Sequence, residues 1–305
     1  MAALALLAVA AVASAQPAAP AGARSVSAGA ALMETIRALT APGMDGREVG
    51  SPGGAKARDY IEGRLTAAGL PPAGTSGYRQ TFAVTTKAGV TRTGTNLITR
   101  CEGRHPDRPA LVVSAHYDHL GVRGGQVYHG ADDNASGVAL ALHLAERCAA
   151  TPFDRPLIFA FFDAEELGLL GAQAFVKAPP VPVNRLALNL NFDMVSRSDR
   201  QEIFVAGPGR WPVLGPLLKP VAEGAPIAVR FGHDTGGGHD DWTAQSDHGA
   251  FHAAGIPFVY LGVEDHADYH QPSDTPDKIT PAFLEGVATV AWRLLSALDR
   301  APSFR

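Results

Sequence analysis

The chain has 305 residues, of which 46% are hydrophobic and 18% charged, and this composition excludes fibrous and largely disordered architectures. Its 26 Lys and Arg against 30 Asp and Glu give a net charge of −4, so we expect no nucleic-acid partner. With 11 His and only 2 Cys, any metal site should be free of sulfur ligands.

The N-terminal segment predicts export. Residues 1–15 are almost entirely apolar and end in Ala13-Ser14-Ala15, a pattern typical of a secretory signal peptide, so we expect a periplasmic or secreted protein. No Lys or Arg follows Met1, and a disordered Ala-rich tail is the alternative. Residues 16–29 are expected to be a linker. No later run is apolar for 18 residues, so we expect no membrane association after signal removal.

The first elements of the predicted domain are two helices and two strands. Helical patterns cover residues 30–39 and 54–68, and Pro71-Pro72 ends the second. Residues 81–86 and 96–100 have the composition of strands.

The middle of the chain predicts a layered α/β fold. Residues 111–115, 157–162 and 186–192 are apolar on both faces, as strands covered by helices on both sides must be. Helical spacing over 136–149 and 165–177 separates them. This β-α-β-α-β series predicts a mostly parallel or mixed central sheet with right-handed crossovers and helices on both faces.

Further strands are expected at residues 203–205, 227–231 and 258–261, and a closing helix at 281–298. No internal repeat or change of composition divides the chain, so we expect a single α/β domain over residues 30–300. Cys101 and Cys148 could form a disulfide in an exported protein, or remain two buried thiols.

Polar side chains follow each of the three buried strands. His116 and Asp118 follow the first strand, Glu165-Glu166 the second, and Asp193 the third. Ligands bind outside the carboxyl ends of strands in open α/β sheets. One such carboxylate could be a helix cap, but several gathered at an apolar edge would repel one another unless a cation neutralised them. The pattern therefore favours a bound metal.

Two other segments could complete a ligand set. Asp132-Asp133 precedes the first crossover helix, where a helix cap would explain only one acidic residue. His270 lies among turn residues near the end of the chain, where a lone His is usually an ordinary loop residue.

Together these motifs resemble peptidase family M28, a family of co-catalytic di-zinc aminopeptidases with the zinc-dependent exopeptidase fold. The resemblance runs from about residue 30 to residue 298. It is carried by His116-x-Asp118, the segment 130–137, Glu165-Glu166, Asn191-Phe-Asp193-Met and Tyr269-His270, with support from Asp45-Gly-Arg47, residues 50–53 and Ser246-Asp247-His248.

The resemblance implies two Zn²⁺ ions. Asp133 would bridge them, with a cis Asp133–Asn134 peptide bond. His116 and Asp193 would complete one metal, while Glu166 and His270 would complete the other. Asp118 matches a carboxylate that orients His116.

It also implies the chemistry. Glu165 matches the general base for attack of a metal-activated water on a peptide with a free N-terminus, and Tyr269 matches a hydroxyl that stabilises the oxyanion. Within the Gly-rich segment 232–242, Asp240 or Asp241 could bind the substrate amine, with Trp242 or Phe251 lining the side-chain pocket. The alternative is a solvated loop.

The motifs leave three alternatives to an aminopeptidase. A glutaminyl cyclase of the same fold uses one zinc and does not need the ligand at His116. A related carboxypeptidase would group basic residues near a motif, which this sequence lacks. A non-catalytic binding homologue would not need to keep Glu165 and every ligand position. Neither oligomeric state nor side-chain preference has a signature in the sequence.

Overall fold

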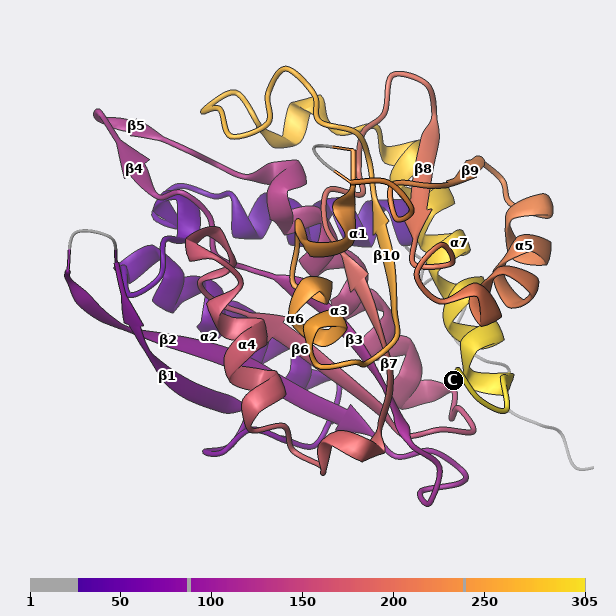
Figure 1. Ribbon diagram of the computed structural model, residues 1–305. Helices are drawn as coiled ribbons and strands as arrows, with labels where there is room; N and C mark the ends of the chain where they lie inside the picture. Colours follow the sequence, from indigo (N-terminus) through magenta and orange to yellow (C-terminus); the bar gives the residue numbers. More distant parts are fainter. Residues whose placement is uncertain (1–26, 87–88, 238–239, 305) are drawn as a thin grey trace, which may run out of the picture.

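A mixed sheet forms the centre of the computed structural model, which describes residues 27–86, 89–237 and 240–304 (Figure 1). The sheet has eight strands in the order β1-β2-β6-β3-β7-β10-β8-β9 within these residues. The strands are β1 (Arg79–Thr85), β2 (Thr91–Cys101), β3 (Ala110–His116), β6 (Leu157–Phe162), β7 (Leu186–Phe192), β8 (Glu202–Ala206), β9 (Ala228–Phe231) and β10 (Phe258–Gly262).

The centre of the sheet is parallel. Strands β6, β3, β7 and β10 run in one direction, and β2 and β8 flank them in antiparallel pairing. Every residue of β3 and β6 is buried, which explains their unbroken apolar sequences. The chain passes from β3 to β6 on one side and then to β7 on the other. The strand order therefore reverses at β3, where a crevice for ligands is expected at the carboxyl ends.

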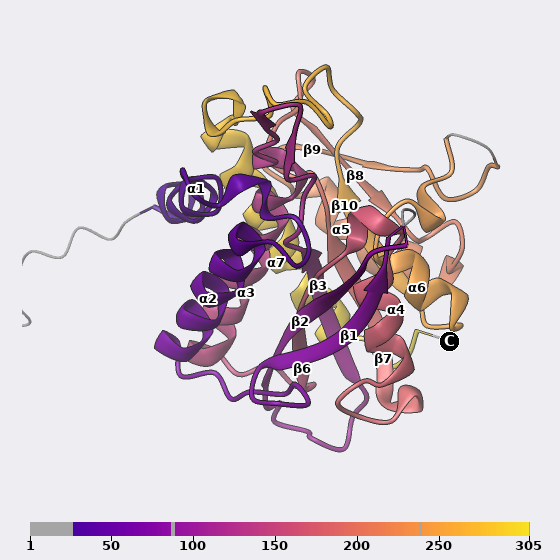
Figure 2. The ribbon, with the colours of Figure 1, turned by 90° about the vertical axis from the view of Figure 1, so that its left-hand side faces the viewer.

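Helices cover both faces of the sheet, as expected (Figure 2). One face carries α1 (Ala28–Leu39), α2 (Pro52–Ala67), α3 (Gly137–Ala150) and α7 (Pro281–Arg300), with α5 (Gly215–Glu223) packed on α7. The other face carries α4 (Leu170–Lys177) and α6 (His248–Ala253). The short hairpin β4 (Val122–Arg123) and β5 (Gln126–Val127) lies outside the main sheet.

The predicted helix over residues 165–177 is wrong in one respect. A 3₁₀ turn at Glu165–Leu167 is separated from α4 by Gly168 and Leu169, which have φ values of 104° and 61°. This left-handed backbone ends the turn, so both glutamates lie in the 3₁₀ turn and not in α4. Helices α5 and α6 and the β4–β5 hairpin were not predicted from the sequence.

The N-terminal predictions lie mostly outside the described residues. The expected signal at 1–15 and most of the expected linker at 16–29 are among them. Helix α1 begins at Ala28, inside the expected linker, because the Ser27 hydroxyl caps it by accepting the Ala30 N–H at 3.2 Å.

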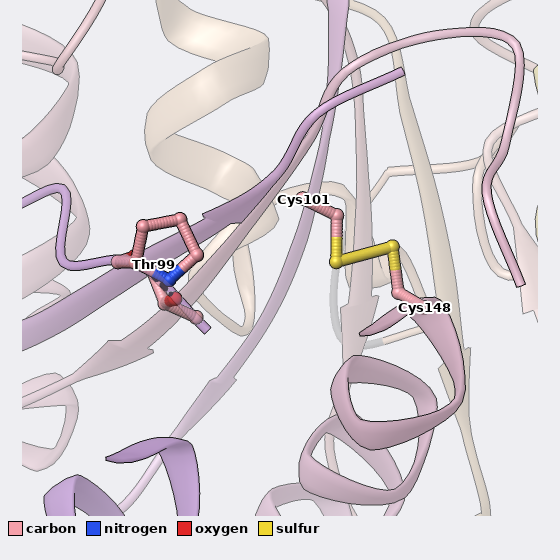
Figure 3. Close-up of a disulfide and its surroundings, with 4 residues drawn as sticks. Thr99, Cys101 and Cys148 are labelled. Carbon is pink, nitrogen blue, oxygen red and sulfur yellow. Dashed lines mark hydrogen bonds between the residues drawn. A yellow bond between two sulfur atoms is a disulfide. The ribbon is translucent and has the colours of Figure 1, made fainter. Parts of the chain in front are cut away.

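A disulfide joins Cys101, at the end of β2, to Cys148 in α3 (Figure 3). The structure thus selects the first of the two states that the sequence left open. Within the described ranges, no helix combines the length and the apolar character that crossing a bilayer would require.

Candidate active site

The three buried strands bring their polar ends together at one edge of the sheet. His116 is the last residue of β3, and Phe162, its partner in register, ends β6 just before the glutamate turn. Asp193 directly follows β7. The His116 Nε2 atom lies 3.3 Å from Asp193 Oδ1 and 4.0 Å from Glu165 Oε2. The predicted convergence at this edge is confirmed.

Asp133 lies between two groups of side chains. Its Oδ1 atom is 3.3 Å from His116 Nε2, and its Oδ2 atom is 3.1 Å from His270 Nε2. His270 Nε2 is also 3.2 Å from Glu166 Oε2. One carboxylate oxygen thus faces His116 and Asp193, and the other faces His270 and Glu166. All five residues expected to bind metal meet in this place.

The distances fit a divalent metal at each position. Two donors on one tetrahedral zinc, each about 2.0–2.1 Å from the ion, lie about 3.3 Å apart. The separations of His116 Nε2 and His270 Nε2 from their carboxylate partners are 3.1–3.3 Å. The donors are imidazole nitrogen and carboxylate oxygen, a set that suits zinc and similar ions.

Burial and charge perturb these groups strongly. Burial would lower the pKa of His116, but the carboxylates of Asp193 and Glu165 outweigh it and raise that pKa well above its usual value. Burial raises the pKa of Glu165 well above its usual range, and Asp193 adds to the increase while His116 opposes it. Buried carboxylates in this number call for compensating positive charge, which a metal supplies.

The loop before α3 is built to hold Asp133. The Asp133–Asn134 peptide is cis, which confirms the expectation from the resemblance. The Asp274 carboxylate accepts the backbone N–H groups of Asp132 at 3.0 Å and of Asp133 at 3.1 Å. The Asn134 side chain donates to the Phe192 carbonyl at 2.9 Å, which ties this loop to the end of β7.

A buried arginine holds the same region from behind. The Arg47 guanidinium donates to the carbonyl oxygens of Tyr117, Leu39, His129 and Gly130 at 2.7–2.9 Å. Burial lowers the pKa of Arg47 to about 10, so it stays charged at neutral pH. Arg47 therefore links the segment after His116 to the start of the Asp133 loop.

Asp118 connects β3 to the glutamate turn. Its carboxylate accepts the N–H of Glu165 at 3.0 Å and of Glu166 at 3.3 Å. The His116 Nδ1 atom lies 3.2 Å from the Asp118 carbonyl oxygen but 3.6 Å from its carboxylate. Asp118 therefore contacts His116 through its backbone carbonyl, and its carboxylate supports the two glutamates. This differs from the expected direct bond between the Asp118 carboxylate and the imidazole.

A cavity of about 330 Å³ opens onto the cluster. Glu165 and Asp193 line it together with the half-buried Tyr269, whose ring stacks on His270 at 3.9 Å between centroids. The lining also includes a set of apolar and aromatic residues, namely Leu169, Met194, Trp242, Tyr260 and Val263. Burial and the nearby carboxylates raise the pKa of the Tyr269 phenol well above its usual value, so it stays protonated.

The four residues expected to bind substrate lie in different surroundings, and only some of them reach a cavity. Trp242 lines the cavity, and Asp240 lines a smaller adjoining one and pairs with His233 at 2.8 Å. Asp241 does not reach the cavity, because its carboxylate caps the turn at Thr243 and pairs with Arg210.

The expectation that Phe251 lines the substrate pocket is wrong. Its side chain is fully buried on α6 and packs against Phe162 and Phe175 with ring centroids 6.2 and 5.7 Å apart. Because α6 was not expected, its inward face could not be recognised from the sequence.

Two buried groups near the site were not predicted as functional. His119 places Nδ1 2.7 Å from Glu166 Oε1 and 3.7 Å from Asp133 Oδ2, and its spacing after His116 is the signal that could have drawn notice. Neither oxygen of the buried Asp247 has a hydrogen-bond partner among the described residues, and this carboxylate contributes to the raised pKa of Glu165.

The sequence matches known proteins over most of this fold. The model of peptidase family M28 matches residues 96–295. The chain is 32% identical over 196 residues to Aminopeptidase YwaD of Bacillus subtilis (strain 168), covering 60% of this chain and 39% of that protein. It is 31% identical over 215 residues to Leupeptin-inactivating enzyme 1 of Streptomyces exfoliatus, covering 69% and 42%. The aligned regions thus span about two fifths of the length of these curated relatives.

Solved structures share the fold. An aminopeptidase from Aneurinibacillus sp. strain AM-1 superposes with a TM-score of 0.69 at 19% identity, covering 91% of this chain and 95% of that one. A glutaminyl cyclase from Fimbriiglobus ruber superposes with a TM-score of 0.72 at 22% identity, covering 93% and 99%. At such identities the likeness concerns the fold alone, and the two proteins are named for different activities.

Proposed function

Because this chain belongs to peptidase family M28, we propose that it is a metal-dependent aminopeptidase that removes N-terminal residues from peptides. The observation that carries the proposal is the carboxylate–imidazole cluster with Glu165 beside it, open to a cavity of about 330 Å³. The relatives named an aminopeptidase and a leupeptin-inactivating enzyme support action on peptides.

We propose that the site binds two Zn²⁺ ions. His116, Asp133 and Asp193 would hold one, and Asp133, Glu166 and His270 the other, at donor separations that suit the ion. Bound zinc supplies Lewis acidity, which polarises a peptide carbonyl and makes a water nucleophile available near neutral pH.

Glu165 is proposed as the general base. Its side chain is only 12% exposed and lines the cavity beside His116 and Asp193. It would take the proton of the attacking water and return it to the leaving amine.

Tyr269 is proposed to stabilise the oxyanion. Its phenol lines the cavity, and its stacking on His270 fixes the ring. A phenol that stays protonated can donate a hydrogen bond to developing negative charge.

The charge of the cavity favours a substrate with a free amine. Five carboxylates line it, and no Lys or Arg does so among the described residues: the acidic groups are Asp133, Glu165, Glu166, Asp193 and Asp265. Asp133, Glu166 and Asp193 would be neutralised by bound zinc, which leaves Glu165 and Asp265 to attract an α-ammonium group and, among the described residues, no cationic side chain to hold a C-terminal carboxylate. This contrast argues against a carboxypeptidase.

The substitution Glu165→Gln tests the catalytic assignment. It keeps the side-chain shape and should leave zinc content unchanged, while kcat falls by about 10²–10⁴-fold because the base is lost. The matched control is Glu223→Gln at an exposed position on α5, which should behave as the wild type. A Glu165→Gln enzyme with full kcat would remove Glu165 from the mechanism.

A glutaminyl cyclase is the second candidate, because the fold matches solved cyclases as well as it matches aminopeptidases. A cyclase releases ammonia from an N-terminal Gln and leaves the peptide at full length, whereas an aminopeptidase shortens it. Mass spectrometry of a Gln-initiated peptide distinguishes the two reactions. The arrangement of His116 and Asp193 around a first metal position supports hydrolysis.

We propose that the protein is exported. The Cys101–Cys148 disulfide supports this, since such bonds persist mainly in oxidising compartments.

A further inference from the structure

His119 lies in the site with one edge of its ring directed at the second metal position. The side chain is fully buried, and Nδ1 lies 2.7 Å from Glu166 Oε1 and 3.7 Å from Asp133 Oδ2. Nε2 has no hydrogen-bond partner in the part of the chain that the structure describes. All of the polar contacts of this imidazole are therefore on its Nδ1 edge.

The surroundings keep the ring in place. The ring lies so close to Gly130 that a Cβ atom there would come within 2.6 Å of His119 Cγ. Gly130 also has a φ of 57°, which favours glycine. Gly130 in turn is held through its carbonyl oxygen by Arg47. The backbone is thus shaped to admit this imidazole beside the Asp133 loop.

We propose that His119 Nδ1 is a further protein ligand of the second metal, in addition to Asp133, Glu166 and His270. This inference rests on the proposed metal-dependent function. The two separations of Nδ1 from carboxylate oxygens, 2.7 and 3.7 Å, lie on either side of the ~3.3 Å expected for donors on one tetrahedral zinc. The His119 and His270 rings are tilted by 59° with centroids 5.8 Å apart, so the two imidazoles approach from different directions.

The consequence is that the two metal positions are unequal. The second position has four protein donors, the number that closes a tetrahedral zinc site. The first has three, from His116, Asp133 and Asp193, the number typical of a catalytic zinc with a position open to solvent or substrate. Glu165 lies on the side of this first position, 4.0 Å from His116 Nε2. The second metal should therefore bind more tightly and the first should exchange more readily.

A purely positioning role for His119 makes a different prediction. In that case Nδ1–H would only donate to Glu166 and orient it, and residues that orient ligands affect metal affinity by about 10–100-fold. Asparagine can still donate a hydrogen bond from nearly the same place as Nδ1, but it is a poor zinc ligand. His119→Asn therefore separates the two roles.

The experiment is a zinc titration of the metal-stripped full chain against a chromophoric competitor. We expect two sites in the wild type and a loss of more than ~100-fold in the tighter one for His119→Asn, as for His270→Asn. The matched control is His105→Asn, at an exposed position away from the site, which should leave both affinities unchanged. A His119→Asn protein that keeps its tighter site within 100-fold of the wild type overturns the proposal.

A second measurement needs no variant. In the wild type loaded with one equivalent of zinc, X-ray absorption should detect two imidazoles on the metal, from His119 and His270. Detection of a single imidazole contradicts the proposal while leaving the proposed function intact. If the wild type binds no zinc at all, the proposed function itself fails, so the two failures are distinguishable.

Discussion

Arg47 offers the sharpest test of how the fold supports the site. The guanidinium is fully buried and donates to four backbone carbonyls, which lie on α1, after β3 and before the Asp133 loop. Lysine keeps the charge, but its single nitrogen cannot reach carbonyls on all three segments. We expect Arg47→Lys to lose about half of these bonds.

The magnitude follows from the hydrogen bonds. A hydrogen bond from a charged donor contributes about 1.5–3 kcal/mol, so losing two of four predicts a destabilisation of about 3–6 kcal/mol for Arg47→Lys. This is a large part of the ~5–15 kcal/mol that typically stabilises a domain. Zinc affinity should fall as well, because the Gly130 carbonyl precedes Asp133 by three residues.

Urea unfolding of the metal-free protein and a separate zinc titration measure both effects. Arg37→Met, at an exposed position on α1, is the control and should change the free energy of unfolding by less than ~0.5 kcal/mol. If Arg47→Lys matches the wild type in both stability and zinc affinity, the supporting role of Arg47 is refuted.

Three further predictions concern the core, the disulfide and pH. Phe251→Ala should lower the free energy of unfolding by about 3–5 kcal/mol and leave KM unchanged, because Phe251 is buried in the core. Trp242→Ala should raise KM, because Trp242 lines the cavity. The reverse pattern would place Phe251 in the pocket. Replacing both Cys101 and Cys148 by Ala should cost about 2–4 kcal/mol in urea unfolding, and an unchanged midpoint would contradict this. Burial lowers the pKa of His248 to about 3, so below about pH 6.5 the unfolded chain takes up a proton that the folded chain excludes. The folded state therefore loses stability as the pH falls from about 6.5 towards 3. His248→Gln should reduce the loss between pH 6.5 and 5 by about 1.5 kcal/mol, and identical pH profiles would contradict the assignment.

The central strands could be predicted because burial on both faces leaves a direct mark on the sequence. The bounds of β6 and β7 agree with the apolar runs at 157–162 and 186–192. The break between the glutamate turn and α4 could not be predicted, since Leu169 adopts a left-handed conformation that its side chain does not favour. Helix α6 has only six residues, too few to show a helical period.

The site was predictable where its residues follow strands, because parallel strands deliver their ends to one edge. His116, the Glu165-Glu166 pair and Asp193 were located in this way. The role of Arg47 was not, because its partners are backbone carbonyls, which carry no sequence signal. His119 follows His116 by three residues, a weak signal, and its contact with Glu166 became evident only in the three-dimensional structure.

The most direct test of the proposed function is hydrolysis of an unblocked aminoacyl reporter and of its N-acetylated counterpart, before chelation, after chelation and after zinc is restored. We predict rapid cleavage of the unblocked reporter alone, loss of that activity on chelation and its recovery with zinc. Cleavage of only the acetylated reporter, or unchanged activity after the metal is removed, would contradict a metal-dependent aminopeptidase.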